Sequence, residues 1–542
     1  MRMMDSARSG NRVGWCWTVL LWSPVALYYA SHFAAALFHP GLRPTGFIQY
    51  DLPYSMACAR EFADNGLHGL LFTLPSTAAV GEPVLLQLHL WFLGQVWRWL
   101  PLDPGLLYVL FGVIAGLLAV RSFLRFFDSV VRVSGSERRW GHVLFVWGGG
   151  ILAFAGELLN LFHGRPLAET WKHLLDLDPA HGWWMMNLGR CLILPNEAYY
   201  HLLYFTAGTA FLEKRHVRAV FSLMLLAASH PFAGTGALVA YGAWSLLERW
   251  NRHERPMPIA VPLAIGGTML ACCAYYFLWL PSRMDPALTA ALPSPYIIEG
   301  RSILPAYSLV LLMALARIRS VDRFKDLMRQ PAGRLLAVMV MAHLLLENHE
   351  LLMTPYQPAH FTRGYSWAAL FLIGAPWLFK EAWPWVKQRS LTRAKVIALP
   401  VVLLLLSDNG AFFALNIKRQ LRASQPGFWL NRDQVGVLAF LNTLGSDAPL
   451  VVSQDDGLGY MTTVYTPLRA YRSHFFDEAD AWSRVKQQAA YFEGRIMDPQ
   501  LNGPLVVIAM KDSGDAILPG AVRLLYQNEG YRVFSTAGAV TR

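Results

Sequence analysis

The segment IQYDLPYSMACAREFADNG, residues 48–66, brings together side chains that can take part in acid–base chemistry. Asp51 could act as a general base, because a carboxylate can take the proton of a hydroxyl nucleophile. Tyr54, Arg60 and Glu61 follow on a predicted helix and could bind a polar substrate. A second interpretation of Asp51 is structural. A carboxylate just before a helix can accept backbone N–H groups as an N-cap, which stabilises the helix by about 0.5–2 kcal/mol.

The helix predicted after Asp51 is amphipathic. One face carries the apolar residues Leu52, Met56, Ala59 and Ala63, and we expect this face to lie on the membrane surface. Arg60 and Asp64 are four residues apart and should form an ion pair on another face. The Asp51 carboxylate could then face a cavity between membrane spans, where partial desolvation makes a carboxylate a stronger base.

Five further residues in predicted outer loops could contact a phosphate group: His230, Arg301, His349, His360 and Arg363. Arg363 precedes a glycine and could hold a phosphate through two parallel hydrogen bonds. The alternative for Arg363, and likewise for Arg301, is an interfacial anchor whose charged end reaches the lipid headgroups. His230 lies in a turn, where a histidine can also serve as a hydrogen-bonded cap. If the five side chains converge, they form one polar pocket.

The composition indicates what kind of chain positions these residues. Of the 542 residues, 54% are hydrophobic and 15% are charged, whereas soluble domains have about 45–50% apolar and about 25% charged residues. We therefore predict an α-helical polytopic membrane protein. The net charge is +11, but the basic residues form short clusters between apolar segments, so we expect no nucleic-acid partner. The five cysteines are too dispersed for a disulfide framework or a zinc site.

About eleven apolar segments are predicted to cross the membrane, near residues 14–38, 105–124, 140–161, 198–213, 217–230, 233–249, 258–280, 303–317, 334–347, 365–380 and 396–416. With this count the basic clusters between the spans lie on the same side of the membrane as the N-terminus. The positive-inside rule therefore predicts that the N-terminus is cytoplasmic. Segment 83–101 mixes polar residues and tryptophans and is predicted to lie in the headgroup region. If it crossed instead, all later basic clusters would face outside. With segment 83–101 at the membrane surface, residues 39–104 form a predicted first external loop with two juxtamembrane helices.

The chain becomes more polar after residue 416, and residues 417–542 are predicted to form a small α/β domain. Predicted strands are PLVVSQDD (449–456), GPLVVIAM (503–510) and YRVFST (531–536), and residues 478–493 are predicted to be helical. We thus expect a transmembrane module, residues 1–416, and an extracytoplasmic domain. The expected location is the inner (cytoplasmic) membrane of a bacterium.

The pattern D-x-x-Y-x-x-x-x-x-R-E, which starts at Asp51 and is followed by Gly66, resembles the first external loop of GT-C membrane glycosyltransferases. Within that group it is similar to the aminoarabinose and protein O-mannosyl transferases. Glu82-Pro83-Val84 is similar to a degenerate form of the Pro motif that opens the second loop helix in that fold. The plan of about eleven spans and an external C-terminal domain is similar as well. The resemblance therefore implies a GT-C-like fold.

The resemblance also implies a reaction. Asp51 would deprotonate an acceptor hydroxyl, which attacks the anomeric carbon of a polyprenyl-phosphate-linked sugar and releases polyprenyl phosphate. The acceptor, a lipid, glycan or protein, is not identified by the sequence, and membrane lipids surround the site. Two positions depart from the family: Leu52 replaces a usual acidic residue, and Glu157 is a weak substitute for an acidic site at the third span. No cofactor is therefore certain, although a divalent metal could bind through Glu157.

The sequence predicts a membrane glycosyltransferase that acts on the outer face of the cytoplasmic membrane, and two alternatives stay open. A non-catalytic scaffold that keeps the fold would agree with Leu52. A secondary transporter would have two related halves and ionisable residues within its spans. The predicted spans contain few such residues, among them Glu157, His201 and His343, which favours a transferase.

Overall fold

The computed structural model describes residues 14–67, 69–74, 82–166, 173–177, 187–251, 256–284, 289, 297, 300–389, 391–424, 428–446, 449–474, 481–512, 518–519 and 522–536. The chain forms two compact units. Unit 1 comprises Met1–Leu27, Gly112–Tyr275 and Leu292–Asn416. Unit 2 comprises Tyr28–Phe111, Tyr276–Ala291 and Ile417–Arg542.

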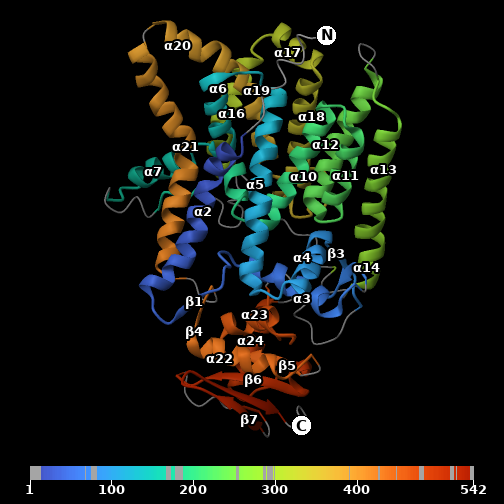
Figure 1. Cartoon of the computed structure of the whole chain (residues 1–542), viewed down its shortest axis with the longest axis vertical. Coiled ribbons are helices and arrows are strands. Elements are labelled where there is room, and N and C mark those ends of the chain that lie inside the picture. Colours follow the sequence, from blue (N-terminus) through green and yellow to red (C-terminus); the bar gives the residue numbers. More distant parts are fainter. Residues whose placement is uncertain are drawn as a thin grey trace. The chain divides into compact units, whose positions relative to one another are not determined.

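Unit 1 is a bundle of helices (Figure 1). Its helices are α6 (Gly135–Trp147), α7 (Leu152–Phe162), α9 (Leu188–Cys191), α10 (Pro195–Leu212), α11 (His216–Ala227), α12 (Pro231–Trp250), α13 (Ala260–Cys273), α16 (Gly300–Arg317), α17 (Val321–Arg329), α18 (Pro331–Glu347), α19 (Tyr365–Trp377) and α20 (Trp383–Arg389). Helix α10 packs against α11, α12 packs against α18, and α19 contacts both α16 and α18. Aromatic rings fill the bundle, and Tyr204 of α10 stacks on Tyr365 of α19 with ring centroids 3.8 Å apart.

Three longer helices have residues in both units: α2 (Trp15–Phe38), α5 (Pro104–Val130) and α21 (Leu391–Leu421). Each predicted membrane segment overlaps a helix, because long apolar runs favour helices in lipid. Among the described residues, four helical stretches are long and apolar enough to cross a membrane, or up to six if each bent pair counts as one span. The length and apolarity of the helices therefore do not establish the expected number of about eleven membrane spans. Short helices such as α11, with 12 residues, do not meet it.

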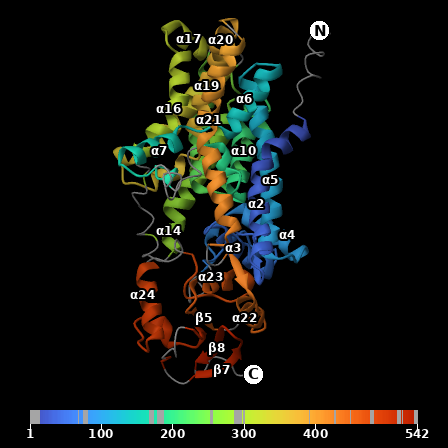
Figure 2. The same ribbon diagram turned by 90° about the vertical axis from the view of Figure 1, so that its left-hand side faces the viewer.

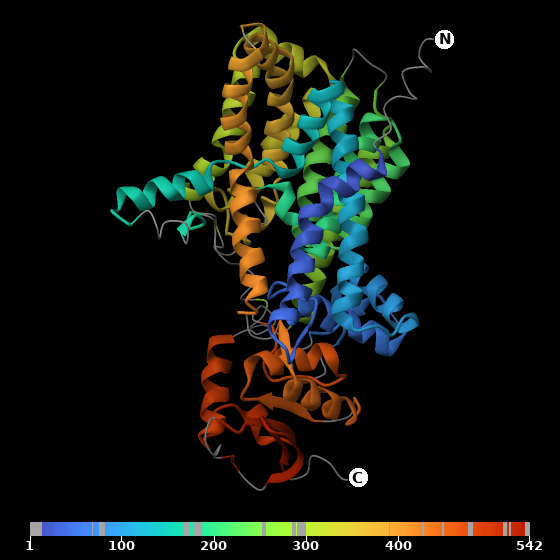
Figure 3. The ribbon, with the colours of Figure 1, turned by 60° about the vertical axis from the view of Figure 1, so that its left-hand side comes forward.

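The predicted span 140–161 is broken into α6 and α7, which are bent by 59°. Figure 3 shows α7 turned away from the rest of unit 1. The buried carboxylate of Asp408 in α21 holds the break, since it accepts backbone N–H groups of Gly150 and Ala153 at 2.9 Å each. A Cβ atom at position 150 would lie 2.3 Å from the carbonyl oxygen of Pro305, so only glycine fits there.

Unit 2 combines the first loop with the C-terminal tail. Its helices are α3 (Leu52–Asn65), α4 (Leu88–Trp99), α14 (Leu280–Arg283), α22 (Arg432–Asn442), α23 (Asp456–Tyr465) and α24 (Ala481–Phe492). Its strands are β1 (Leu42–Pro44), β2 (Leu71–Phe72), β3 (Leu85–Leu86), β4 (Trp429–Asn431), β5 (Leu450–Ser453), β6 (Leu505–Met510), β7 (Val522–Gln527) and β8 (Tyr531–Thr536). Strand β1 of the loop pairs antiparallel with β4 of the tail. The predicted tail domain is therefore joined to the loop in one unit.

The tail contains a four-stranded sheet in the order β5-β6-β8-β7. Strands β5 and β6 are parallel, and the other pairs are antiparallel. Figure 2 shows this sheet with α24 beside it. Val452, Val507 and Tyr491 belong to a buried core between the sheet and α24. The strands and helix predicted in the tail thus exist, whereas β7, α22 and α23 were not predicted.

The apolar face of α3 is buried in protein, so the expectation that it lies on the membrane surface is wrong. Leu52, Met56 and Ala59 are at most 4% exposed, and α3 packs against α4 and α23. Helix α4 has 12 residues, which gives it a length of about 18 Å. That is shorter than the roughly 30 Å hydrocarbon layer, and the interfacial position of residues 83–101 stays a prediction.

Candidate functional site

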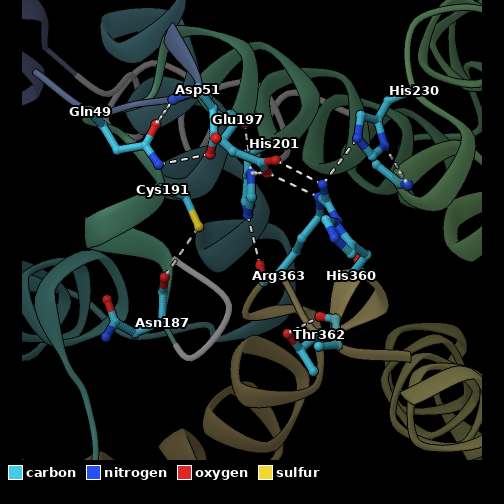
Figure 4. Close-up of polar contacts among 12 residues, drawn as sticks. Gln49, Asp51, Asn187, Cys191, Glu197, His201, His230, His360, Thr362 and Arg363 are labelled. Carbon is cyan, nitrogen blue, oxygen red and sulfur yellow. Dashed lines mark hydrogen bonds and ion pairs between the residues drawn. The ribbon is translucent and has the colours of Figure 1, made fainter. Parts of the chain in front are cut away.

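The Asp51 carboxylate does not cap α3, although the residue occupies the N-cap position. Its Oδ2 accepts a hydrogen bond from Gln49 Nε2 at 2.7 Å, and its Oδ1 lies 3.0 Å from His474 Nε2 (the Gln49 bond is drawn in Figure 4). An ionised carboxylate has no proton to donate, so His474 Nε2 carries the hydrogen. The Asp51 side chain is 38% exposed. The cap interpretation is therefore wrong, and the carboxylate is held in one orientation with part of its surface open.

Three tyrosines hold His474 in place. Its ring stacks on Tyr50 and Tyr54, with ring centroids 5.0 and 4.8 Å apart. The Tyr460 hydroxyl donates to the Tyr50 carbonyl at 2.7 Å and accepts the Tyr54 N–H at 3.0 Å. The histidine itself is only 3% exposed. The loop and the tail therefore both contribute to the surroundings of Asp51. Asp51 and His474 are 423 residues apart in the sequence, and the packing of the tail against the loop brings them into contact.

Arg60 and Glu61 make contacts inside unit 2. Arg60 donates to the Val464 carbonyl at 2.8 Å, and its Nε lies 3.4 Å from Asp64 Oδ2, which confirms the predicted ion pair. Burial lowers the pKa of Arg60 and raises the pKa of Asp64, and the pairing offsets part of both shifts. Glu61 Oε2 accepts the backbone N–H and the hydroxyl of Thr73 at 2.9 and 2.8 Å. These two residues hold α3 to its neighbours, and their role toward a substrate stays a prediction.

Arg363 lies in unit 1 as one half of a buried ion pair. Its Nε and Nη2 donate to the two carboxylate oxygens of Glu197 at 3.0 and 2.9 Å (Figure 4). Nη2 also lies 3.2 Å from His230 Nε2, and Nη1 donates to the His360 carbonyl. The side chain is 2% exposed. This geometry disagrees with both expectations for Arg363, because a buried guanidinium that is paired with Glu197 does not reach the lipid headgroups and is not open to a phosphate.

The neighbours of Arg363 stabilise its charged form and the backbone conformation of residues 363 and 364. Burial lowers the pKa of the guanidinium, but the Glu197 carboxylate more than offsets this effect, so the net shift is upward. The ring nitrogens of His201 lie 2.7 and 2.8 Å from the carbonyl oxygens of Glu197 and Arg363. Arg363 and Gly364 both have positive φ, at 34° and 70°. Such a backbone is strained for arginine, and the ion pair offsets that strain.

The predicted histidines of the outer loops have structural contacts. His230 Nδ1 accepts the Ala233 N–H and so caps α12, as one interpretation expected. His349 is 7% exposed, and its ring nitrogens lie 2.7 Å from the Leu346 carbonyl and 2.8 Å from the Tyr356 N–H. His360 stacks on Phe232. His230 and His360 thus lie beside Arg363, but they surround an internal ion pair.

Two other predicted residues lie elsewhere in unit 1. Arg301 is exposed in the first turn of α16. Glu157 is half-buried on α7. Within the described parts of the chain, no group of three or more His, Cys, Asp or Glu side chains could hold a metal ion. Glu157 therefore does not fit a metal site built from these residues, and no metal enters the chemistry below.

Sequence reasoning missed the partners that define both clusters. His474 and Tyr460 of the tail were not connected with Asp51, and Glu197 was not connected with Arg363. Asp408 was hidden inside an apolar span. A buried carboxylate in such a span needs a partner, and this rule was the one available signal for Asp408. For His474 the sequence offers none, since nothing local relates residues so far apart.

Comparisons with known proteins give matches in structure alone. No family model matches the chain, and the search of curated proteins found no match. The chain is similar to ArnT from Cupriavidus metallidurans bound to undecaprenyl phosphate, with 11% identity, a TM-score of 0.45, and coverage of 98% of this chain and 100% of that one. It is also similar to the Archaeoglobus fulgidus oligosaccharyltransferase, with 11% identity, a TM-score of 0.46, and coverage of 91% and 70%.

Because the identities are near one tenth and the TM-scores lie under 0.5, we draw no conclusion on activity from these matches.

Proposed function

We propose that the chain is a membrane glycosyltransferase that takes a sugar from a polyprenyl-phosphate carrier on the outer face of the cytoplasmic membrane. The observation that carries the proposal is the state of Asp51. Its carboxylate does not cap the helix, is oriented by Gln49 and His474, and is 38% exposed. A carboxylate with a purely structural role would usually be satisfied by its helix or by a buried cation.

In the proposed reaction Asp51 takes the proton of an acceptor hydroxyl. The acceptor oxygen then forms a bond to the anomeric carbon of the sugar, and the bond from that carbon to the phosphate oxygen breaks. The electron pair leaves with polyprenyl phosphate. His474 and Gln49 donate to the carboxylate and fix its direction, and an acceptor hydroxyl would approach the part of the carboxylate that is exposed. His474 is therefore a positioning residue.

The donor phosphate requires cationic contacts. Of the two arginines that the sequence suggested for this role, one keeps the assignment and the other does not. Arg301 keeps its proposed role as a phosphate contact because it is exposed. Arg363 is assigned to its ion pair with Glu197 instead. Tyr54 stacks on the histidine beside Asp51 and is proposed to line the acceptor site. The tail supplies His474 and Tyr460, so we propose that it also helps select the acceptor.

The proposal can be tested with purified protein and a panel of prenyl-phosphate sugars. Release of prenyl phosphate is followed by mass spectrometry for wild type, Asp51→Asn and Asp64→Asn. Asp64 is the matched control, because it is an exposed carboxylate on the same helix with a surface ion pair. We expect glycolipid binding in all three, and release in wild type and Asp64→Asn only.

Other results would assign the chain differently. Equal release by wild type and Asp51→Asn would contradict the role of Asp51 as base. Binding without release for every sugar and acceptor offered would favour the non-catalytic scaffold. Movement of the glycolipid or of a solute across a vesicle membrane, without release, would favour the transporter.

A further inference from the structure

Unit 1 contains a cavity that the proposed reaction does not use. It lies between the start of α2, the middle of α5, the end of α10 and the start of α11, and has a volume of about 160 Å³. Its lining combines arginines with apolar and hydroxyl-bearing side chains. Pockets that enclose drug-sized ligands measure roughly 300–1,000 Å³. This cavity therefore suits one charged group rather than a whole lipid or cofactor.

The cavity is positively charged, with three arginines and one glutamate in its lining. Arg121 and Arg125 are four residues apart on α5 and so share a face. The Arg121 guanidinium lies over the Trp15 ring, 4.3 Å from its centroid. Glu213 is paired with Arg215 at 3.2 Å, which offsets its negative charge. The cavity thus has an excess of cationic groups.

Two of the arginines have free hydrogen-bonding capacity. Arg125 and Arg218 are exposed, and in the described part of the chain neither guanidinium has an ion-pair or hydrogen-bond partner. The hydroxyls of the cavity are already satisfied, since Ser122 bonds with Thr206 and Thr209 donates to its own helix. The ligand that fits is an anion with several oxygen acceptors, and arginine matches phosphate geometry.

The apolar residues that line the cavity indicate that the phosphate belongs to a lipid. Leu118, Leu202 and Ala210 provide apolar surface beside the arginines. Leu118 and Arg121 belong to α5, whose apolar sequence is long enough to cross a bilayer. A phosphate group with an aliphatic tail could place its head on the arginines and its tail along such helices. Basic pockets between membrane helices are typical binding sites of anionic lipid headgroups.

We propose that this cavity binds the headgroup phosphate of an anionic membrane phospholipid, with Arg125 and Arg218 as its direct contacts. Arg121 is held by Trp15 and adds charge to the cavity. The basic side of the bundle is the one predicted to face the cytoplasm, so the lipid belongs to that leaflet. The site is independent of Asp51 and of the transferase proposal. Its role would be to fix α5, α10 and α11 in the membrane.

The test is native mass spectrometry of the full-length protein released from nanodiscs that contain phosphatidylglycerol and phosphatidylcholine. The variant is Arg125→Gln/Arg218→Gln, and the control is Arg132→Gln/Arg139→Gln. The control removes the same charge from exposed arginines outside the cavity. Wild type and control should retain bound phosphatidylglycerol, and the cavity variant should bind it about tenfold more weakly.

Three results would overturn the proposal. Equal loss of lipid in variant and control would indicate general attraction of anionic lipid, and retention in both would place the lipid elsewhere. Displacement of the lipid by millimolar inorganic phosphate would indicate a site for a free anion. If the glutamine variant does not fold, Arg125→Lys/Arg218→Lys replaces it. This variant keeps the charge but loses the bidentate contact, so it should bind more weakly than wild type.

Discussion

The two charged clusters of this protein hold their carboxylates in opposite ways. Glu197 in unit 1 is 9% exposed, and both of its oxygens accept from the guanidinium of Arg363. Asp51 in unit 2 is 38% exposed, and its partners include the Gln49 amide and the His474 ring. The first carboxylate is neutralised and enclosed. The second is held in one orientation but keeps part of its surface open.

This difference separates a structural charge from a charge suited to chemistry. A buried ion pair has no capacity left for a substrate, and breaking it leaves an uncompensated charge in protein. A partly exposed carboxylate fixed by hydrogen bonds can meet a hydroxyl group without rearrangement. Substitutions in the Arg363 cluster should therefore affect stability first, and substitutions in the Asp51 cluster should affect activity first.

The largest effect on stability is expected for Arg363→Ala. It leaves the Glu197 carboxylate buried without its partner, which should lower the free energy of unfolding by about 3–5 kcal/mol. Thermal unfolding in detergent would show a lower midpoint for this variant. The double variant Glu197→Leu/Arg363→Met should be more stable than either single change. Single variants within 1 kcal/mol of wild type would contradict the assignment.

The largest effect on activity is expected for Asp51→Asn. The amide keeps the shape of the side chain but cannot take a proton, so the rate of sugar transfer should fall by about 10²–10⁴. Initial rates of prenyl phosphate release measure this loss. Asp51→Glu is a second control that retains a base in altered geometry, and it should recover part of the rate.

A smaller loss of activity is expected for His474→Phe. Phenylalanine preserves the ring stacked on Tyr50 and Tyr54 but cannot donate to Asp51. The rate should fall by about tenfold, with a cost in stability of about 1 kcal/mol for the lost hydrogen bond. His474→Gln keeps a donor and should retain more activity. A positioning role also predicts a changed pH profile of kcat/KM, which a purely structural role would leave unchanged.

The smallest effect is expected for Asp64→Ala. Its ion pair with Arg60 is exposed on the Asp64 side, where 48% of the side chain is accessible. Surface pairs of this kind contribute about 0.5 kcal/mol or less. Thermal unfolding and transfer assays should both give values close to wild type. A large loss of transfer activity would mean that the substrate contacts this end of α3.

The sequence predicted the parts of the molecule that depend on local patterns. Each apolar run predicted to cross the membrane overlaps a helix. Short apolar runs predicted β5 and β6, and a stretch with alternating burial predicted β8, because these patterns act within a few residues. The pairing of Arg60 with Asp64 followed from helical spacing. Strand β7 was not predicted, because VRLLYQ is mostly exposed and its residues do not show the pattern of a buried strand.

Contacts between distant segments could not be predicted. Arg363 was expected at a lipid or phosphate surface, because its partner Glu197 lies 166 residues away. The N-cap stayed open as a second interpretation of Asp51, because the donors at residues 49 and 474 were not visible as neighbours. The apolar face of α3 was assigned to the membrane for the same reason. Hydrophobic patterning says that a face is buried, and it does not say whether lipid or protein covers it.

The central claim, that Asp51 is a base and not a structural anchor, is tested most directly by comparing stability and turnover in one preparation of Asp51→Asn. Thermal unfolding and prenyl phosphate release are measured side by side with wild type, using a sugar that wild type turns over. The account predicts an unfolding midpoint close to wild type together with loss of turnover. Retained turnover, or a drop in the midpoint as large as that of Arg363→Ala, would contradict it.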